Sequence, residues 1–209
     1  MVESVPTRHR LMTEGMRLFA QRGFHETSVG EIEAAAGLQP RRGALYKHFA
    51  TKQALLEAAV RAHLKNTEHG AIEIGGIDFA KIARTDPSLL RPVLAGVGRW
   101  FLDQMDGMRD LTRLIEHDGE RLAALTIEVK RDIIDLGYRT AADLIRAAAT
   151  ETVDADAIAV VLLGALVAQR RTVWTFGSPP LNVDDDRAVT AWTELALTTF
   201  ESLSRSSTS

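Results

Sequence analysis

Apolar residues recur along most of this 209-residue chain at the three- and four-residue spacing of helices. No stretch shows the sustained two-residue alternation of a strand bounded by turn residues. Start and stop signals separate the helical segments, beginning with Thr7 and Gly23 at the two ends of the first one. The pattern predicts an all-α protein of about nine helices, namely three short ones, a long connector and five more.

The N-terminal segments carry the clearest capping signals. Ser28 and Glu31 form an S-x-x-E capping box that opens a second short helix, which ends at Gly37. A third short helix is expected from about Arg41 to Phe49, and Thr51 caps a long helix that runs towards residue 70 or beyond. Two short helices joined by a tight connection, the second of them basic, are typical of a helix-turn-helix.

The remaining chain reads as a helical body. We expect a hinge or loop over Gly70–Thr85, a helix that starts at Asp86-Pro87, and a long helix from about residue 120 to residue 150. A further helix starts at Thr152 or Asp154, and a last one follows 184–186. The longest apolar run, 157–168, falls short of the roughly 20 residues that span a membrane, so it predicts a buried or interface helix.

Charge is unevenly distributed. Residues 1–70 carry ten Lys or Arg and seven Asp or Glu, whereas the chain as a whole has a net charge of −3. Between Ala34 and Leu56 there are four Lys or Arg residues and no acid. A basic N-terminal region on an acidic body suggests a head that binds a polyanion.

Several classes of function are excluded or disfavoured. The chain has no cysteine, which rules out disulfides, thiolate metal sites and cysteine nucleophiles. No phosphate-loop, serine-hydrolase or zinc-protease motif occurs, so we expect no catalytic residue, no metal and no cofactor. The N-terminus lacks the apolar run of a signal peptide, and a cytoplasmic location is expected.

Short motifs follow one another in a specific order in two segments, residues 18–38 (LFAQRGFHETSVGEIEAAAGL) and residues 43–56 (GALYKHFATKQALL). In the order of these motifs the chain resembles the DNA-binding domain of the TetR family of bacterial repressors, over roughly residues 8 to 60. The segment from Gly37 to Tyr46 is two residues longer than is usual in that family. The resemblance implies a DNA-binding domain over 1–52 and a helical domain over 53–209 that binds a small effector and dimerises.

Candidate DNA contacts follow from side-chain chemistry. Guanidinium groups clamp guanine or phosphate, hydroxyls and ammonium groups bind phosphate, and small residues let a helix approach base edges. The candidates are Thr27, Ser28, Gln39, Arg41, Arg42, Gly43, Ala44, Tyr46, Lys47, His48 and Lys52. Ser28 has a competing capping role, Gly43 a competing packing role, and Lys52 is equally compatible with a surface lysine.

A pocket for an apolar effector needs apolar walls and a few polar anchors. The candidates in the body are Trp100, Phe101, Gln104, Met105, Met108, His117, Gln169 and Trp174. Each is individually also compatible with an ordinary core or surface position. The last two helices have more apolar surface than one face needs, and the resemblance implies that they form a homodimer that reads palindromic DNA.

Taken together, the sequence predicts a transcriptional regulator, most simply a repressor that leaves double-stranded DNA when a small apolar effector binds. Two alternatives stay open. One is an all-helical enzyme or small-molecule carrier with an incidental basic head, and the other is a DNA-binding protein without an effector.

Overall fold

The computed structural model describes residues 6–40, 42–120, 122–150 and 152–205. Over these residues the chain forms helices and turns, with no strand. The predicted all-α fold is therefore confirmed. Two compact units are formed, one from Met1–Asn66 and Met108–Arg131, the other from Thr67–Gly107 and Asp132–Ser209.

The first unit is built around α1. It contains α1 (Thr7–Arg22), α2 (Val29–Ala35), a 3₁₀ turn η1 (Leu45–Lys47), the first part of α3 (Lys52–Gly75), α6 (Arg109–Asp118) and α7 (Ala123–Val129). Helix α1 packs against α2 and α6. Apolar side chains without exposed surface in this unit come from α1, α2, η1, α3 and α6: Leu11, Phe19, Ile32, Leu45, Leu55, Leu56, Val60 and Leu114.

Three of the predicted capping signals in this unit are confirmed, whereas the expectation that Thr7 caps α1 was wrong, because Thr7 is the first residue of the helix and the N-cap position is Pro6, which provides no side-chain hydrogen bond. Helix α1 ends at Gly23, whose φ of 87° is one that L side chains rarely adopt. Ser28 and Glu31 form the reciprocal capping box at the start of α2. The Thr51 hydroxyl accepts a hydrogen bond from the Ala54 amide at 2.9 Å, as expected of the cap of α3.

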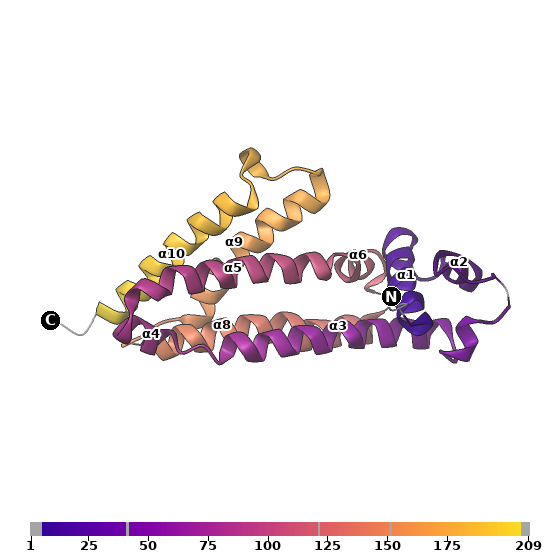
Figure 1. Ribbon diagram of the computed structural model, residues 1–209, viewed down its shortest axis with the longest axis horizontal. Coiled ribbons are helices and arrows are strands. Elements are labelled where there is room, and N and C mark those ends of the chain that lie inside the picture. The colour runs from indigo at the N-terminus through magenta and orange to yellow at the C-terminus, as the bar shows by residue number, and fades with distance from the viewer. Residues whose placement is uncertain (1–5, 41, 121, 151, 206–209) are drawn as a thin grey trace, which may run out of the picture. The chain divides into compact units, whose positions relative to one another are not determined.

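The second unit consists of the rest of α3 together with α4 (Phe79–Thr85), η2 (Pro87–Leu89), α5 (Leu90–Gly107), α8 (Asp135–Ala148), α9 (Ala155–Phe176), η4 (Pro180–Asn182) and α10 (Asp185–Arg205). Helices α9 and α10 form a hairpin that packs on α5, and α9 also packs on α8 (Figure 1). Gly98 allows the close approach of α5 and α10, because a Cβ there would lie 3.0 Å from the Trp192 ring.

Three expectations about helix boundaries were wrong. The third short helix was expected over 41–49, but the described residues 42–49 form only the single 3₁₀ turn η1, because Gly43 has a left-handed φ of 68° that no helix continues through. The region 70–85 is mostly helical, since α3 runs to Gly75 and α4 covers 79–85. The long helix expected over 120–150 is divided into α7 and α8 by a π-helical turn at Lys130–Ile134.

Helix α9 carries the apolar run noted in the sequence. Of the helices in the described part of the chain, it is the one whose length and composition would suffice to cross a membrane, and 22% of that stretch is buried. Val160 and Val161 on this helix are 55% and 71% exposed. The helix therefore contributes to a core on one side and leaves apolar surface on another.

Candidate nucleic-acid interface

The start of α2 is fixed by local hydrogen bonds. The Ser28 hydroxyl accepts from the Glu31 amide at 3.3 Å, and the Glu31 carboxylate accepts from the Ser28 amide at 2.8 Å. These hydrogen bonds from Ser28, with the nearby Arg22 guanidinium, hold the pKa of Glu31 below its usual value. The reciprocal hydrogen bonds confirm the predicted capping role of Ser28. Ser28 is also exposed, so its hydroxyl lies at the surface.

A buried carboxylate organises the segment that follows α2. The Leu45 amide donates to Glu33 Oε1 at 2.9 Å, and both side chains have no exposed surface. This bond satisfies a backbone donor at the start of η1 that would otherwise be buried without a partner. Because η1 contains only Leu45–Lys47, the chain reaches this turn through the irregular segment that ends at Gly43.

The turn η1 presents a set of polar side chains to solvent. Tyr46 is 59% exposed, and Gln39, Arg42, Lys47 and His48 are exposed as well. None of these five side chains has a hydrogen bond or ion pair with another described residue. Gly43 and Ala44 are half-buried beside them. Seven of the predicted DNA contacts therefore lie on one short segment, and Arg41, within the same segment, lies outside the described residues.

Two other candidates face inward. Thr27 is 1% exposed, and its hydroxyl donates to the Gly23 carbonyl at 2.9 Å. The Lys52 ammonium donates to the carbonyls of Phe24 at 2.7 Å and Thr27 at 2.8 Å, and lies 4.5 Å from the Phe24 ring centroid. Where the sequence suggested phosphate contacts, the structure gives both side chains internal partners that hold the turn between α1 and α2.

The same turn is also held from α6, by a contact that the sequence analysis missed. The Asp118 carboxylate is 5% exposed and accepts a hydrogen bond from the Phe24 amide at 2.6 Å. The partners are 94 positions apart in the sequence, so no local pattern could have indicated the contact. The turn that sets the position of α2 is thus fixed by side chains from α3 and α6.

The eight predicted effector residues are divided between the two compact units. Trp100, Phe101, Gln104 and Met105 lie half-buried on α5, and Gln169 and Trp174 lie on α9, all in the second unit. Met108 and His117 belong to the first unit instead.

Within the second unit two of these side chains have polar partners. The Gln169 amide donates to Asp185 at 3.2 Å, and the Trp174 indole donates to Asp106 at 3.1 Å. Both are thereby oriented towards acidic residues. An apolar effector pocket at these positions stays a prediction.

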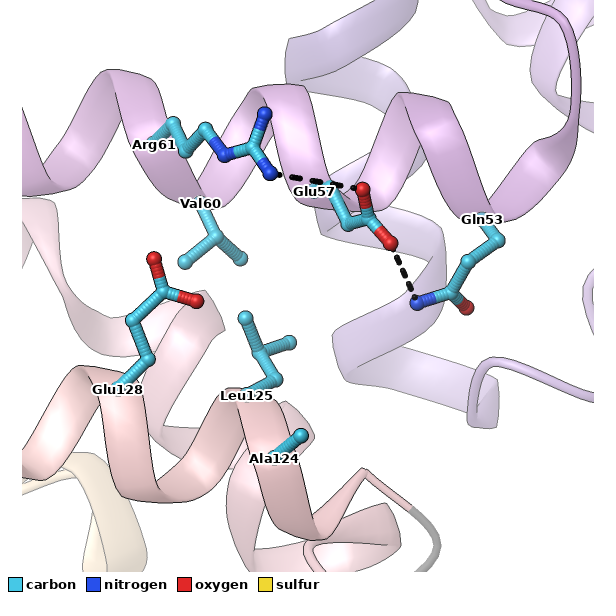
Figure 2. Close-up of a pocket in the computed structure, with 7 residues that line it drawn as sticks. All are labelled: Gln53, Glu57, Val60, Arg61, Ala124, Leu125 and Glu128. Atoms are coloured by element: carbon cyan, nitrogen blue, oxygen red, sulfur yellow. Dashed lines mark hydrogen bonds and ion pairs between the residues drawn. The ribbon is translucent and has the colours of Figure 1, made fainter.

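A small cleft does occur in the first unit, between α3 and α7. Val60 and Leu125 form its apolar floor, and Glu57 and Arg61 stand at its rim (Figure 2). The Gln53 amide donates to Glu57 at 3.3 Å, so the rim is partly tied together. The remaining lining residues are Ala124 and Glu128, and no predicted effector residue is among the seven.

Comparison with known proteins identifies the N-terminal region. Residues 11–59 match the family model described as bacterial regulatory proteins, tetR family. The chain is 36% identical over 58 residues to the HTH-type transcriptional regulator UidR of Escherichia coli (strain K12), which covers 28% of this chain and 29% of UidR. It is 45% identical over 96 residues to AcrR of Shigella flexneri, covering 46% of this chain and 41% of AcrR. These matches thus span well under two thirds of the relatives' length.

The fold of the whole chain also has solved counterparts. A putative TetR-family transcriptional regulator from Mesorhizobium loti superposes with a TM-score of 0.65 over 92% of this chain and 95% of that one, at 18% identity. At such identity the likeness shows the fold, which extends over both compact units. The family match over residues 11–59 identifies the N-terminal region of this chain as a domain of the tetR family of bacterial regulatory proteins.

Proposed function

We propose that this protein is a cytoplasmic, homodimeric transcriptional regulator that binds a palindromic operator in double-stranded DNA. The observation that carries the proposal is the exposed turn around η1. Arg42 and Lys47 are cationic, Gln39, Tyr46 and His48 can donate hydrogen bonds, and none of these side chains has a partner among the described residues. Cations and donors of this kind bind phosphates and read base edges.

The hydrogen bonds that hold the turn between α1 and α2 support the same function. Lys52 and Asp118 hold that turn from two other helices, and Thr27 closes it from within. A recognition surface needs such support, because contacts to bases require side chains held in a fixed register. Ser28 lies at the exposed start of α2, and its hydroxyl would contact a phosphate by exchanging the hydrogen bond that it donates to Glu31 Oε2 at 2.7 Å. The DNA-binding domain of the proposal covers 1–52.

Dimerisation is proposed through α9 and α10. Val160 and Val161 on α9 and Leu195 on α10, which is 60% exposed, leave apolar surface on both helices of the hairpin. Pairing this hairpin with that of a second copy would form a four-helix bundle. Two heads would then bind two half-sites, and linkage of the two binding events would raise the affinity for DNA.

The proposal includes a small-molecule effector. Structural neighbours at 19% and 15% identity are described as the flavonoid-responsive regulator FrrA and as a fatty acid degradation regulator, FadR, from Bacillus halodurans. We place a small apolar effector in the domain over 53–209, against the aromatic and methionine side chains of α5 and Trp174 of α9. Effector binding would release the DNA only by favouring a conformation that binds the operator less well.

Two alternatives are weighed against this proposal. An enzyme or carrier would not need exposed cations around η1 that have no partner among the described residues, and the relatives found by sequence are transcriptional regulators. A DNA-binding protein without an effector would bind duplexes equally well with and without small molecules. The first alternative predicts no duplex binding, and the second predicts no release.

A titration by fluorescence anisotropy tests the proposal. The probes are the duplex directly upstream of the protein's own gene and a scrambled duplex of the same composition, at physiological salt. Selective binding of the first duplex, or of a duplex selected from a random pool, is the expected result. Absence of any preferred duplex after such a selection would overturn the proposal. A panel of flavonoids and fatty acids added to the complex then tests for release.

A further inference from the structure

One cation near the exposed turn belongs to a different helix. Arg8 lies in the first turn of α1, and its guanidinium carbon is 5.0 Å from the ring centroid of Phe49. Phe49 is 5% exposed and directly follows the exposed residues Tyr46, Lys47 and His48. The core ring therefore serves as a platform that places a guanidinium from α1 next to the turn η1.

Among the described residues, no carboxylate neutralises the charge of Arg8. Its side chain is exposed, and its polar contact in the described residues is Nη1 to the Met12 sulfur at 3.3 Å, a weak acceptor. Arg10 resembles Arg8 in this respect, since its Nη2 donates to the Thr7 hydroxyl at 3.4 Å and it has no carboxylate partner among the described residues. The two arginines farther along α1 differ. Arg17 pairs with Glu14 at 2.7 Å, and Arg22 pairs with Glu31 at 2.5 Å.

The geometry determines what Arg8 can bind. A guanidinium that lies over an aromatic ring has its edge free, and that edge carries the N–H donors that fit two phosphate oxygens. Contact with the ring restricts the side chain, so less side-chain entropy is lost when it binds. A base edge is a less suitable partner, because Arg8 lies on α1 rather than on the helix-turn-helix segment that would enter the major groove.

We infer that Arg8 is a phosphate anchor that extends the DNA-binding surface from η1 to the start of α1. This inference rests on the proposed function. The inference adds a residue of α1 to the proposed DNA-binding surface, and the contact assigned to this residue does not depend on the base sequence of the DNA. Arg8 would fix the register of the head on the duplex, while Arg42 and its neighbours face the groove.

The test compares Arg8→Ala and Arg8→Lys with Arg17→Ala as the matched control on the same helix. Affinity for the preferred duplex and for a scrambled duplex is measured over a series of salt concentrations. Each lost phosphate contact lowers the slope of log K against log salt by about 0.9. Arg8→Ala should therefore reduce the slope by about 0.9 per subunit and weaken both duplexes by the same factor, whereas Arg8→Lys and Arg17→Ala should keep the slope of the unmodified protein.

The thermal midpoint of each variant separates a structural role from a binding role. A lower midpoint in Arg8→Ala with an unchanged salt slope would show that Arg8 only covers Phe49, and would overturn the inference. Selective weakening of the preferred duplex alone would also overturn it, because that result indicates a base contact. If selection from random duplexes finds no preferred duplex, the proposed function fails and the inference fails with it. An unchanged slope in Arg8→Ala beside normal binding by the unmodified protein refutes the inference alone.

Discussion

Lys52 offers the sharpest test of how this protein divides its cations between fold and function. Its ammonium group donates to the carbonyls of Phe24 and Thr27 at 2.7 and 2.8 Å and lies over the Phe24 ring. Burial lowers the pKa of Lys52, and Glu26 opposes that effect. Replacing Lys52 with Met keeps most of the length of the side chain and removes both hydrogen bonds together with the cation–π contact.

The expected loss of stability can be worked from these contacts. A hydrogen bond to a charged group contributes about 1.5–3 kcal/mol when it is buried. Lys52 is only partly buried, so water screens the interaction and about 0.5–1 kcal/mol for each bond is a fair discount. A partly exposed cation–π contact adds about 0.5 kcal/mol. Lys52→Met should therefore cost about 2 kcal/mol, which corresponds to a fall in Tm of about 4–8 °C for a chain of this length.

The matched control is Lys47→Met, five positions earlier in the chain. Lys47 is exposed and has no partner among the described residues, so its loss should change the free energy of unfolding by less than about 0.5 kcal/mol. Circular dichroism during heating measures both variants, and anisotropy titrations measure their DNA binding. The reasoning is refuted if Lys52→Met keeps the Tm of the unmodified protein and lowers the salt slope as Lys47→Met does. In that case the ammonium group binds phosphate rather than the turn.

Three further outcomes are expected. Arg42→Ala should cost roughly 1–3 kcal/mol of DNA-binding energy and relax the preference at one base pair if Arg42 reads a base, which a selection from random duplexes would show; an unchanged preference would place base recognition elsewhere. Glu33→Leu leaves the buried Leu45 amide without an acceptor and should cost about 1–3 kcal/mol of stability in urea unfolding, whereas Glu33→Gln keeps an acceptor oxygen and should cost less. Burial raises the pKa of Asp185, but hydrogen bonds from Arg170 and Gln169 outweigh that effect and hold the pKa below the usual 3.8. The stabilisation by Asp185 is therefore present above pH 3.8 and is lost as the pH falls further. Asp185→Asn should remove this part of the loss of stability in acid, and melting curves at low pH that match those of the unmodified protein would contradict the assignment.

Much of the fold could be predicted because its signals are local. A capping box needs only four consecutive residues, and Ser28 and Glu31 form it as expected. Asp154 caps α9 through the Ala157 amide, and Gly177 ends that helix with a left-handed φ of 75°. In each case the residues that decide the helix boundary are neighbours in the sequence, so the chemistry of the side chain suffices.

The errors arise where local propensity was given the wrong weight. The glycines over 70–85 suggested a hinge, yet Gly70 and Gly75 both lie within α3. A glycine costs a helix only about 1 kcal/mol, which helix packing can offset. The helix expected over 41–49 includes Gly43, which instead takes a left-handed conformation that reduces this helix to one turn. Composition alone does not distinguish these two outcomes.

The support of the candidate site could not have been predicted from a periodic pattern. Glu33 sits beside Ile32 on a short helix and reads as a surface charge, but it is buried because the Leu45 amide, twelve positions later, needs an acceptor. Asp118 similarly reads as part of a solvated turn and becomes the acceptor for Phe24. Such contacts depend on which elements pack together, and that information is absent from any single segment.

The salt dependence of DNA binding measures how many of the exposed cations of this protein contact phosphate. Lys52 is committed to backbone carbonyls, whereas Arg8, Arg42 and Lys47 have no carboxylate partner among the described residues. If those three each neutralise one phosphate in both subunits of a dimer, log K should fall with log salt with a slope of about −5, and Arg41 would steepen it to about −7. A slope near −2 would mean that most of these cations stay hydrated in the complex. In that case recognition would depend on neutral donors such as Gln39 and Tyr46, and the cations would serve mainly to steer the protein towards DNA.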